Sequence, residues 1–117
     1  ALFQADLAQA EARLRAARMY LTGTLADVWR EIEQRNRLTL DQRMAIRLAA
    51  SQSLHDAVAA GDAAYHAAGA SAVFERNPFE RRFRDLHAVA QQLQGRRAHF
   101  ETVGRYLLGL EPDLAFA

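Results

Sequence analysis

Several residue types are missing from this chain, and each absence removes a class of function. The 117 residues include no cysteine, which excludes disulfide bonds and thiolate chemistry and argues against a small secreted scaffold. No apolar run approaches the ~20 residues that a membrane-spanning helix needs, and the sequence shows no signal-peptide pattern. We therefore expect a cytoplasmic protein that does not work in a membrane.

Lysine is also absent, so that all 15 basic residues are arginines. Together with the abundance of alanine, this usage indicates a GC-rich bacterial genome. The formal net charge is only +1, so no global field attracts nucleic acid or an anionic membrane. The arginines at 76–84 are interleaved with acidic residues, which would weaken contacts with a phosphate backbone. Nucleic-acid binding is therefore not expected.

Apolar residues at helical spacing predict a long first helix over residues 3–36, because one apolar stripe recurs at every seventh position. The stripe consists of Leu7, Leu14, Leu21 and Val28, joined by Leu25 and Ile32. A capping box of Thr39 and Gln42 predicts that a second helix begins near Leu40. That helix is rich in alanine and is expected to run to Ala68, with Gly69 as its C-terminal cap.

Two shorter helices are predicted after an irregular link. Asn77 followed by Pro78 is typical of a helix start, and Gly95 ends this third helix. The fourth helix carries Phe100, Val103 and Leu107, and its predicted end is a glycine cap at Gly109 followed by Leu110. No stretch alternates convincingly with a period of two.

These elements predict an all-α fold, namely an up-and-down four-helix bundle with two long and two shorter helices. The length fits one domain spanning residues 1–117. Because the sequence starts in helical rhythm without an initiator methionine, we expect this domain to be a fragment of a longer chain.

Candidate catalytic and metal-binding residues are few. None of the four histidines belongs to a His-x-x-x-His or Glu-x-x-His pair, so the motifs of a di-iron bundle are missing. No Ser-His-Asp or glycine-rich phosphate-loop signature is present either. Arg84 and Asp85 differ from the other charged residues, because neighbours in a helix do not face each other. Each of the two is therefore expected to have its own partner elsewhere.

The segment from Asn77 to Asp85, "NPFERRFRD", resembles the C-terminal helical domain of the acyl-CoA dehydrogenase superfamily, as do "AEARLRAARMYL" and "LTLDQRMAIRLAASQSLHDAV" upstream. The likeness is closest to the branch of flavin-dependent monooxygenases that includes two-component hydroxylases. The resemblance implies a full-length flavin-dependent oxidoreductase in which this domain, inactive alone, supplies flavin contacts and an oligomerisation surface. It also implies a homo-oligomer, a dimer or tetramer, with FAD or FMN and a small-molecule substrate but no metal.

The resemblance also implies a set of cofactor-binding residues: Gly69, Ser71, Arg84, Asp85 and Gln92. Gly69 and Ser71 correspond to a loop that approaches the phosphates of the flavin nucleotide. Arg84 and Asp85 correspond to an Arg-Asp pair near the cofactor and the subunit contacts. The arginine-rich start of the third helix is accordingly expected to be buried against a partner.

The chain departs from both branches of this superfamily at their usual acid-base positions. Gln92 stands where the hydroxylase branch often has histidine, and glutamine can donate a hydrogen bond but cannot act as an acid or base at neutral pH. Gln94-Gly95 stands near the place of a Glu-Gly in the dehydrogenase branch, and His87 is only a substitute candidate. We therefore assign no catalytic residue. A non-catalytic helical interaction bundle is the alternative interpretation.

Overall fold

The computed structural model describes residues 2–68, 78–91 and 96–114, and this part of the chain is mostly helical, with no strand. It contains four α-helices: α1 (Leu2–Arg35), α2 (Leu40–Ala68), α3 (Pro78–Ala90) and α4 (Ala98–Leu107). The predicted all-α class, with two long and two shorter helices, is confirmed.

The turn between α1 and α2 is built from local hydrogen bonds. Asn36 adopts a left-handed conformation (φ 54°), which asparagine tolerates better than most residues, and its N–H donates to the Ile32 carbonyl over 2.7 Å. At the start of α2, the Thr39 N–H donates to Gln42 Oε1 over 2.8 Å, and the Gln42 N–H donates to Thr39 Oγ1 over 3.2 Å. The predicted capping box is thus confirmed.

The end of α4 is a complete glycine cap. Gly109 has a φ of +78°, the conformation that costs glycine least. Its N–H donates to the Tyr106 carbonyl over 3.0 Å, and the Leu110 N–H donates to the Arg105 carbonyl over 2.8 Å. These are the two bonds of the Schellman motif, so the predicted stop at Gly109 is confirmed.

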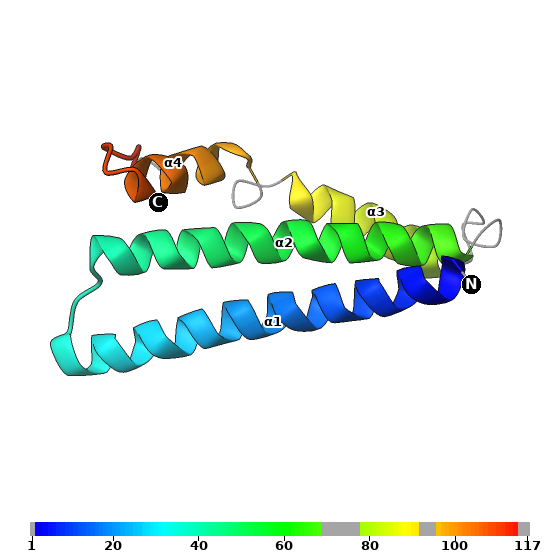
Figure 1. Cartoon of the computed structure of the whole chain (residues 1–117), viewed down its shortest axis with the longest axis horizontal. Coiled ribbons are helices and arrows are strands. Elements are labelled where there is room, and N and C mark those ends of the chain that lie inside the picture. The colour runs from blue at the N-terminus through cyan, green and yellow to red at the C-terminus, as the bar shows by residue number, and fades with distance from the viewer. Residues whose placement is uncertain (1, 69–77, 92–95, 115–117) are drawn as a thin grey trace.

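The predicted up-and-down bundle is not confirmed, because of how the two short helices run. In Figure 1, α1 and α2 form a long antiparallel hairpin, and α3 and α4 follow one another along α2 in the same direction, opposite to that of α2. The helix α2 packs against each of the other three helices. The chain therefore has three layers with α2 in the middle. It measures 51 × 25 × 25 Å.

This central position explains the small residues of α2. The backbones of α1 and α2 approach closely where Ser53, Ala49 and Ala17 are all buried, and the Ser53 hydroxyl donates to the Ala17 carbonyl over 3.1 Å. On another side of α2, the His55 ring lies 5.3 Å from the Phe100 ring of α4, centroid to centroid. Small side chains permit close approach in more than one direction, whereas a single apolar stripe would serve only one neighbour.

The first helix is consequently covered on one side only. Of its predicted stripe, Val28 is buried, but Leu7, Leu14 and Leu25 are between 43% and 52% exposed. Trp29, which flanks the stripe, is 63% exposed. The apolar spacing correctly predicted the helix but not the number of neighbours that cover it. No helix in the described ranges has an apolar stretch suited to crossing a membrane.

Candidate functional site

The candidate site is the outer face of α3, whose inner face rests on the second half of α2. Leu86 marks the inner face: a Cβ atom built on Gly61 of α2 would lie 2.2 Å from Leu86 Cδ2. Any larger residue at position 61 would force the Leu86 side chain to shift. Since successive helical residues are turned by about 100°, Arg84, two positions earlier, points away from α2, and it is exposed.

The predicted site residues divide into two groups. Arg84 and Asp85 lie on the outer face of α3, and both are exposed. Neither takes part in any hydrogen bond or ion pair found among the described residues. Gly69, Ser71 and Gln92 lie outside the described residues.

The arginine-rich start of α3 is exposed within this chain. Arg81, Arg82 and Arg84 all have exposed side chains. No segment of the described chain covers them, so the expected burial against a partner stays a prediction.

Sequence reasoning missed the polar contact that joins α3 to α2. Oδ1 of Asp62 lies 2.6 Å from Nε2 of His87, and the two side chains are 41% and 40% exposed. These residues are 25 positions apart, and nothing in either local sequence predicts their pairing. Gly61, an isolated glycine inside a helical pattern, is compatible with such a contact, but Gly23 shows the same pattern with nothing within 4 Å of its Cβ position.

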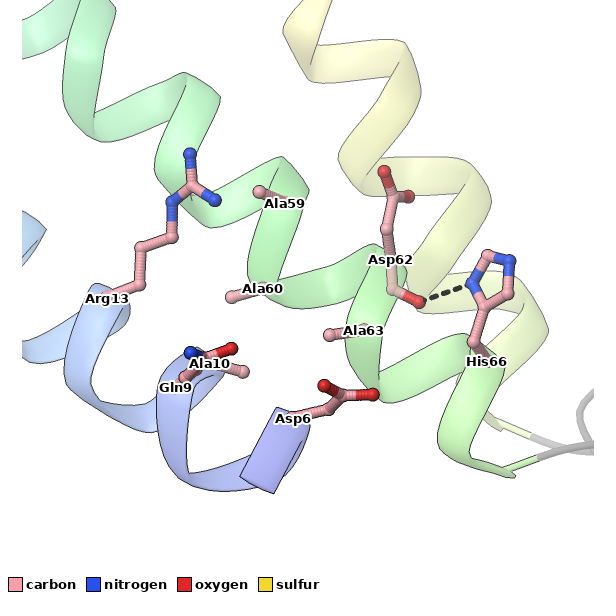
Figure 2. A pocket seen from close by; sticks show the side chains of 9 residues that line it. All are labelled: Asp6, Gln9, Ala10, Arg13, Ala59, Ala60, Asp62, Ala63 and His66. Carbon is pink, nitrogen blue, oxygen red and sulfur yellow. Dashed lines mark hydrogen bonds between the residues drawn. The ribbon is translucent and has the colours of Figure 1, made fainter. Parts of the chain in front are cut away.

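A pocket of about 570 Å³ lies beside this contact, between the start of α1 and the end of α2. Figure 2 shows that its floor is formed by alanines, whereas Asp6, Gln9, Arg13 and His66 lie around it. Arg13 Nε donates to Asp56 Oδ1 over 2.7 Å, and His66 Nδ1 lies 2.7 Å from the Asp62 carbonyl oxygen. The pocket contains none of the predicted site residues.

A metal centre has no support from the described geometry. Among the described residues, no three histidine or carboxylate side chains come close enough together to hold a metal ion. Two of the histidines contact other partners: His55 lies against the Phe100 ring, and His87 lies against Asp62.

Comparison with known proteins matches residues 1–96 to the family described as acyl-CoA dehydrogenase, C-terminal domain. The chain is also similar to the indole-3-acetate monooxygenase of Acinetobacter baumannii, with 29% identity over 109 residues. That similarity covers 93% of this chain but only 28% of the relative. The resemblance found in the motifs is thus confirmed: the chain belongs to the family of acyl-CoA dehydrogenase C-terminal domains.

Proposed function

We propose that this chain is the C-terminal helical domain of a flavin-dependent oxidoreductase or monooxygenase, and that it supplies flavin contacts and an oligomerisation surface. Family membership supports the first part, and the similarity to a monooxygenase favours oxygenation. The observation that carries the proposal is the outward-facing pair Arg84-Asp85, on a helix whose inner face is held by Leu86 and His87.

The chemistry of this pair fits a flavin nucleotide. Arg84 presents a guanidinium that no described residue pairs with, and such a group binds phosphate oxygens in a bidentate way. The Asp85 carboxylate can accept hydrogen bonds from hydroxyl or N–H groups. Gly69, Ser71 and Gln92 complete the proposed set of contacts to FAD or FMN.

The role proposed for the chain is binding and orientation. Gln92 can donate a hydrogen bond but holds no transferable proton at neutral pH, and the proposal assigns no catalytic acid or base to this domain. A bound flavin supplies the redox chemistry. The substrate, a small molecule, is proposed to be bound mainly by the parts of the protein outside these residues.

The uncovered side of α1 is the proposed oligomerisation surface. It consists of Leu7, Leu14, Leu25 and Trp29, which lie on one line of the helix and are 43–63% exposed. Large apolar side chains exposed along one line of a helix fit a surface that contacts another protein. We propose that a second copy covers this line in a dimer or tetramer.

The test is the flavin content of the intact protein. Arg84→Ala is expected to lower the flavin-to-protein ratio after desalting at least tenfold, because the anionic nucleotide loses a charged partner. Arg82→Ala is the matched control, since it removes the same charge from an exposed position of the same helix. Wild-type flavin content in Arg84→Ala would contradict the proposal.

A further inference from the structure

Two successive residues of α2 contact two successive residues of α3. Gly61 receives the side chain of Leu86, with only 2.2 Å between Leu86 Cδ2 and the position of a Cβ atom on Gly61. In the next position of both helices, Asp62 Oδ1 lies 2.6 Å from His87 Nε2. We call these four residues the α2–α3 clamp.

The two halves of the clamp constrain α3 in different ways. The contact of Leu86 with Gly61 fixes how close the helices lie, but an apolar contact is non-directional and permits small rotations. A hydrogen bond of 2.6 Å is directional and weakens steeply when its angle closes. The bond from His87 to Asp62 therefore restrains the rotation of α3 about its own axis.

The orientation of the Asp62 carboxylate fits its hydrogen bond with His87. Figure 2 shows it pointing towards α3, while the backbone carbonyl of the same residue faces His66. The neighbouring cation on α1, Arg13, is engaged by Asp56 over 2.7 Å instead.

The rotation of α3 decides where its outer face points. Arg84 and Asp85 precede Leu86 directly, so any turn of the helix carries both side chains with it. At about 6 Å from a helix axis, the outer reach of a helix with side chains, a rotation of about 10° displaces a group by about 1 Å. Displacements of that size are enough to disrupt a positioned contact.

From this geometry we infer that Asp62 and His87 are positioning residues for the cofactor-contact face of α3. They touch no cofactor themselves. Their bond holds the angle at which Arg84 and Asp85 are presented. The inference rests on the proposed function, because it needs that face to contact the flavin.

The test uses the intact protein and pairs each disruptive variant with a conservative one. Asp62→Ala and His87→Ala both remove the bond. Asp62→Asn keeps an oxygen that accepts from Nε2, and His87→Gln keeps an N–H that donates to the carboxylate. Asp27→Ala is the control, since it removes an aspartate from an exposed ion pair with Arg30 within α1.

The readouts are the flavin-to-protein ratio after desalting, the absorbance spectrum of the retained flavin, and hydrogen exchange of the α3 amides. Both alanine variants are expected to lower flavin retention at least threefold and to speed α3 exchange. Asp62→Asn and His87→Gln are expected to restore most of the flavin retention and most of the protection of α3 from exchange. A single half-exposed polar contact adds little to global stability, so the unfolding temperature is expected to change little.

The remaining outcomes separate this inference from the proposed function. If Arg84→Ala loses flavin but the alanine variants at 62 and 87 keep it, the positioning role is wrong and the flavin contact stands. If none of the three variants loses flavin, both are wrong. If the conservative variants lose as much flavin as the alanine variants, the bond itself is not the positioning element, and the inference is overturned.

Discussion

The buried hydroxyl of Ser53 on α2 donates to the backbone carbonyl of Ala17 on α1 over 3.1 Å. Ala17 and Ser53 are both buried, and Ala49 of α2 is fully buried as well. Small side chains and this hydrogen bond therefore hold the two long helices together at this point.

Replacing Ser53 tests this close approach. Ser53→Ala should lower the free energy of unfolding by about 1 kcal/mol, the usual net value of one intramolecular hydrogen bond. Ser53→Leu should cost more, about 1–3 kcal/mol beyond that, because the extra carbons force the helices apart. Urea unfolding of the chain measures both, with an unchanged m-value as the check that compactness is preserved. If Ser53→Leu were as stable as Ser53→Ala, the close approach of α1 and α2 at this residue would be contradicted.

The capping box at the start of α2 also links the two long helices. Thr39 and Gln42 exchange two backbone-to-side-chain hydrogen bonds, and Gln42 Nε2 also donates to Glu31 Oε2 of α1. Thr39→Ala should therefore cost about 1 kcal/mol, seen as a fall of about 4 °C in the unfolding temperature. Thr39→Ser keeps the acceptor and should retain most of the stability. If Thr39→Ser lost as much stability as Thr39→Ala, the role of the Thr39 hydroxyl in the capping box would be contradicted.

Replacing Gly23 or Gly61, two glycines inside helices, with a larger residue is expected to change the stability of the protein in opposite directions. An added Cβ on Gly23 meets nothing within 4 Å, whereas one on Gly61 meets Leu86. Gly23→Ala should raise stability by about 1 kcal/mol through helix propensity. Gly61→Val should lower it by about 1–3 kcal/mol, because Leu86 must leave its place. Thermal unfolding measures both changes. A Gly61→Val variant as stable as the wild-type chain would contradict the contact between Gly61 and Leu86.

The glycine cap of α4 offers a second matched pair. Gly109 has a φ of +78°, and Gly104 lies within the helix with free space around its Cβ position. Gly109→Ala should cost about 1–2 kcal/mol, the penalty of a left-handed residue with a Cβ. Gly104→Ala should stabilise α4. Because α4 is short, the effect should appear as faster or slower hydrogen exchange of its amides. Equal exchange in the two variants would contradict the cap.

Local signals in the sequence predicted the helices well, because their ends are determined by neighbouring residues. The capping box and the glycine cap need only a few consecutive positions, and both were predicted at the correct residues. The packing of α3 was not predicted, since it depends on Gly61 and Asp62 meeting Leu86 and His87, which lie 25 positions away.

The layered arrangement was missed for a related reason. Spacing in α1 predicts an apolar stripe, and half of that stripe stays partly exposed to solvent, as Leu14 and Leu25 show. An apolar stripe indicates which residues can be buried, but not which element of the fold buries them. The motif from Asn77 to Asp85 predicted the family, and the family match confirms it. Two of the predicted site residues, Arg84 and Asp85, lie on an exposed face of α3.

The most direct test of the central claim is to purify the intact protein, incubate it with FAD or with FMN, and pass it through a sizing column with light-scattering and visible-absorbance detection. We predict a dimer or tetramer that elutes with bound flavin, and the retained nucleotide identifies the cofactor. A colourless monomer after both incubations would contradict the claim, leaving a helical domain with neither a flavin contact nor an oligomerisation surface.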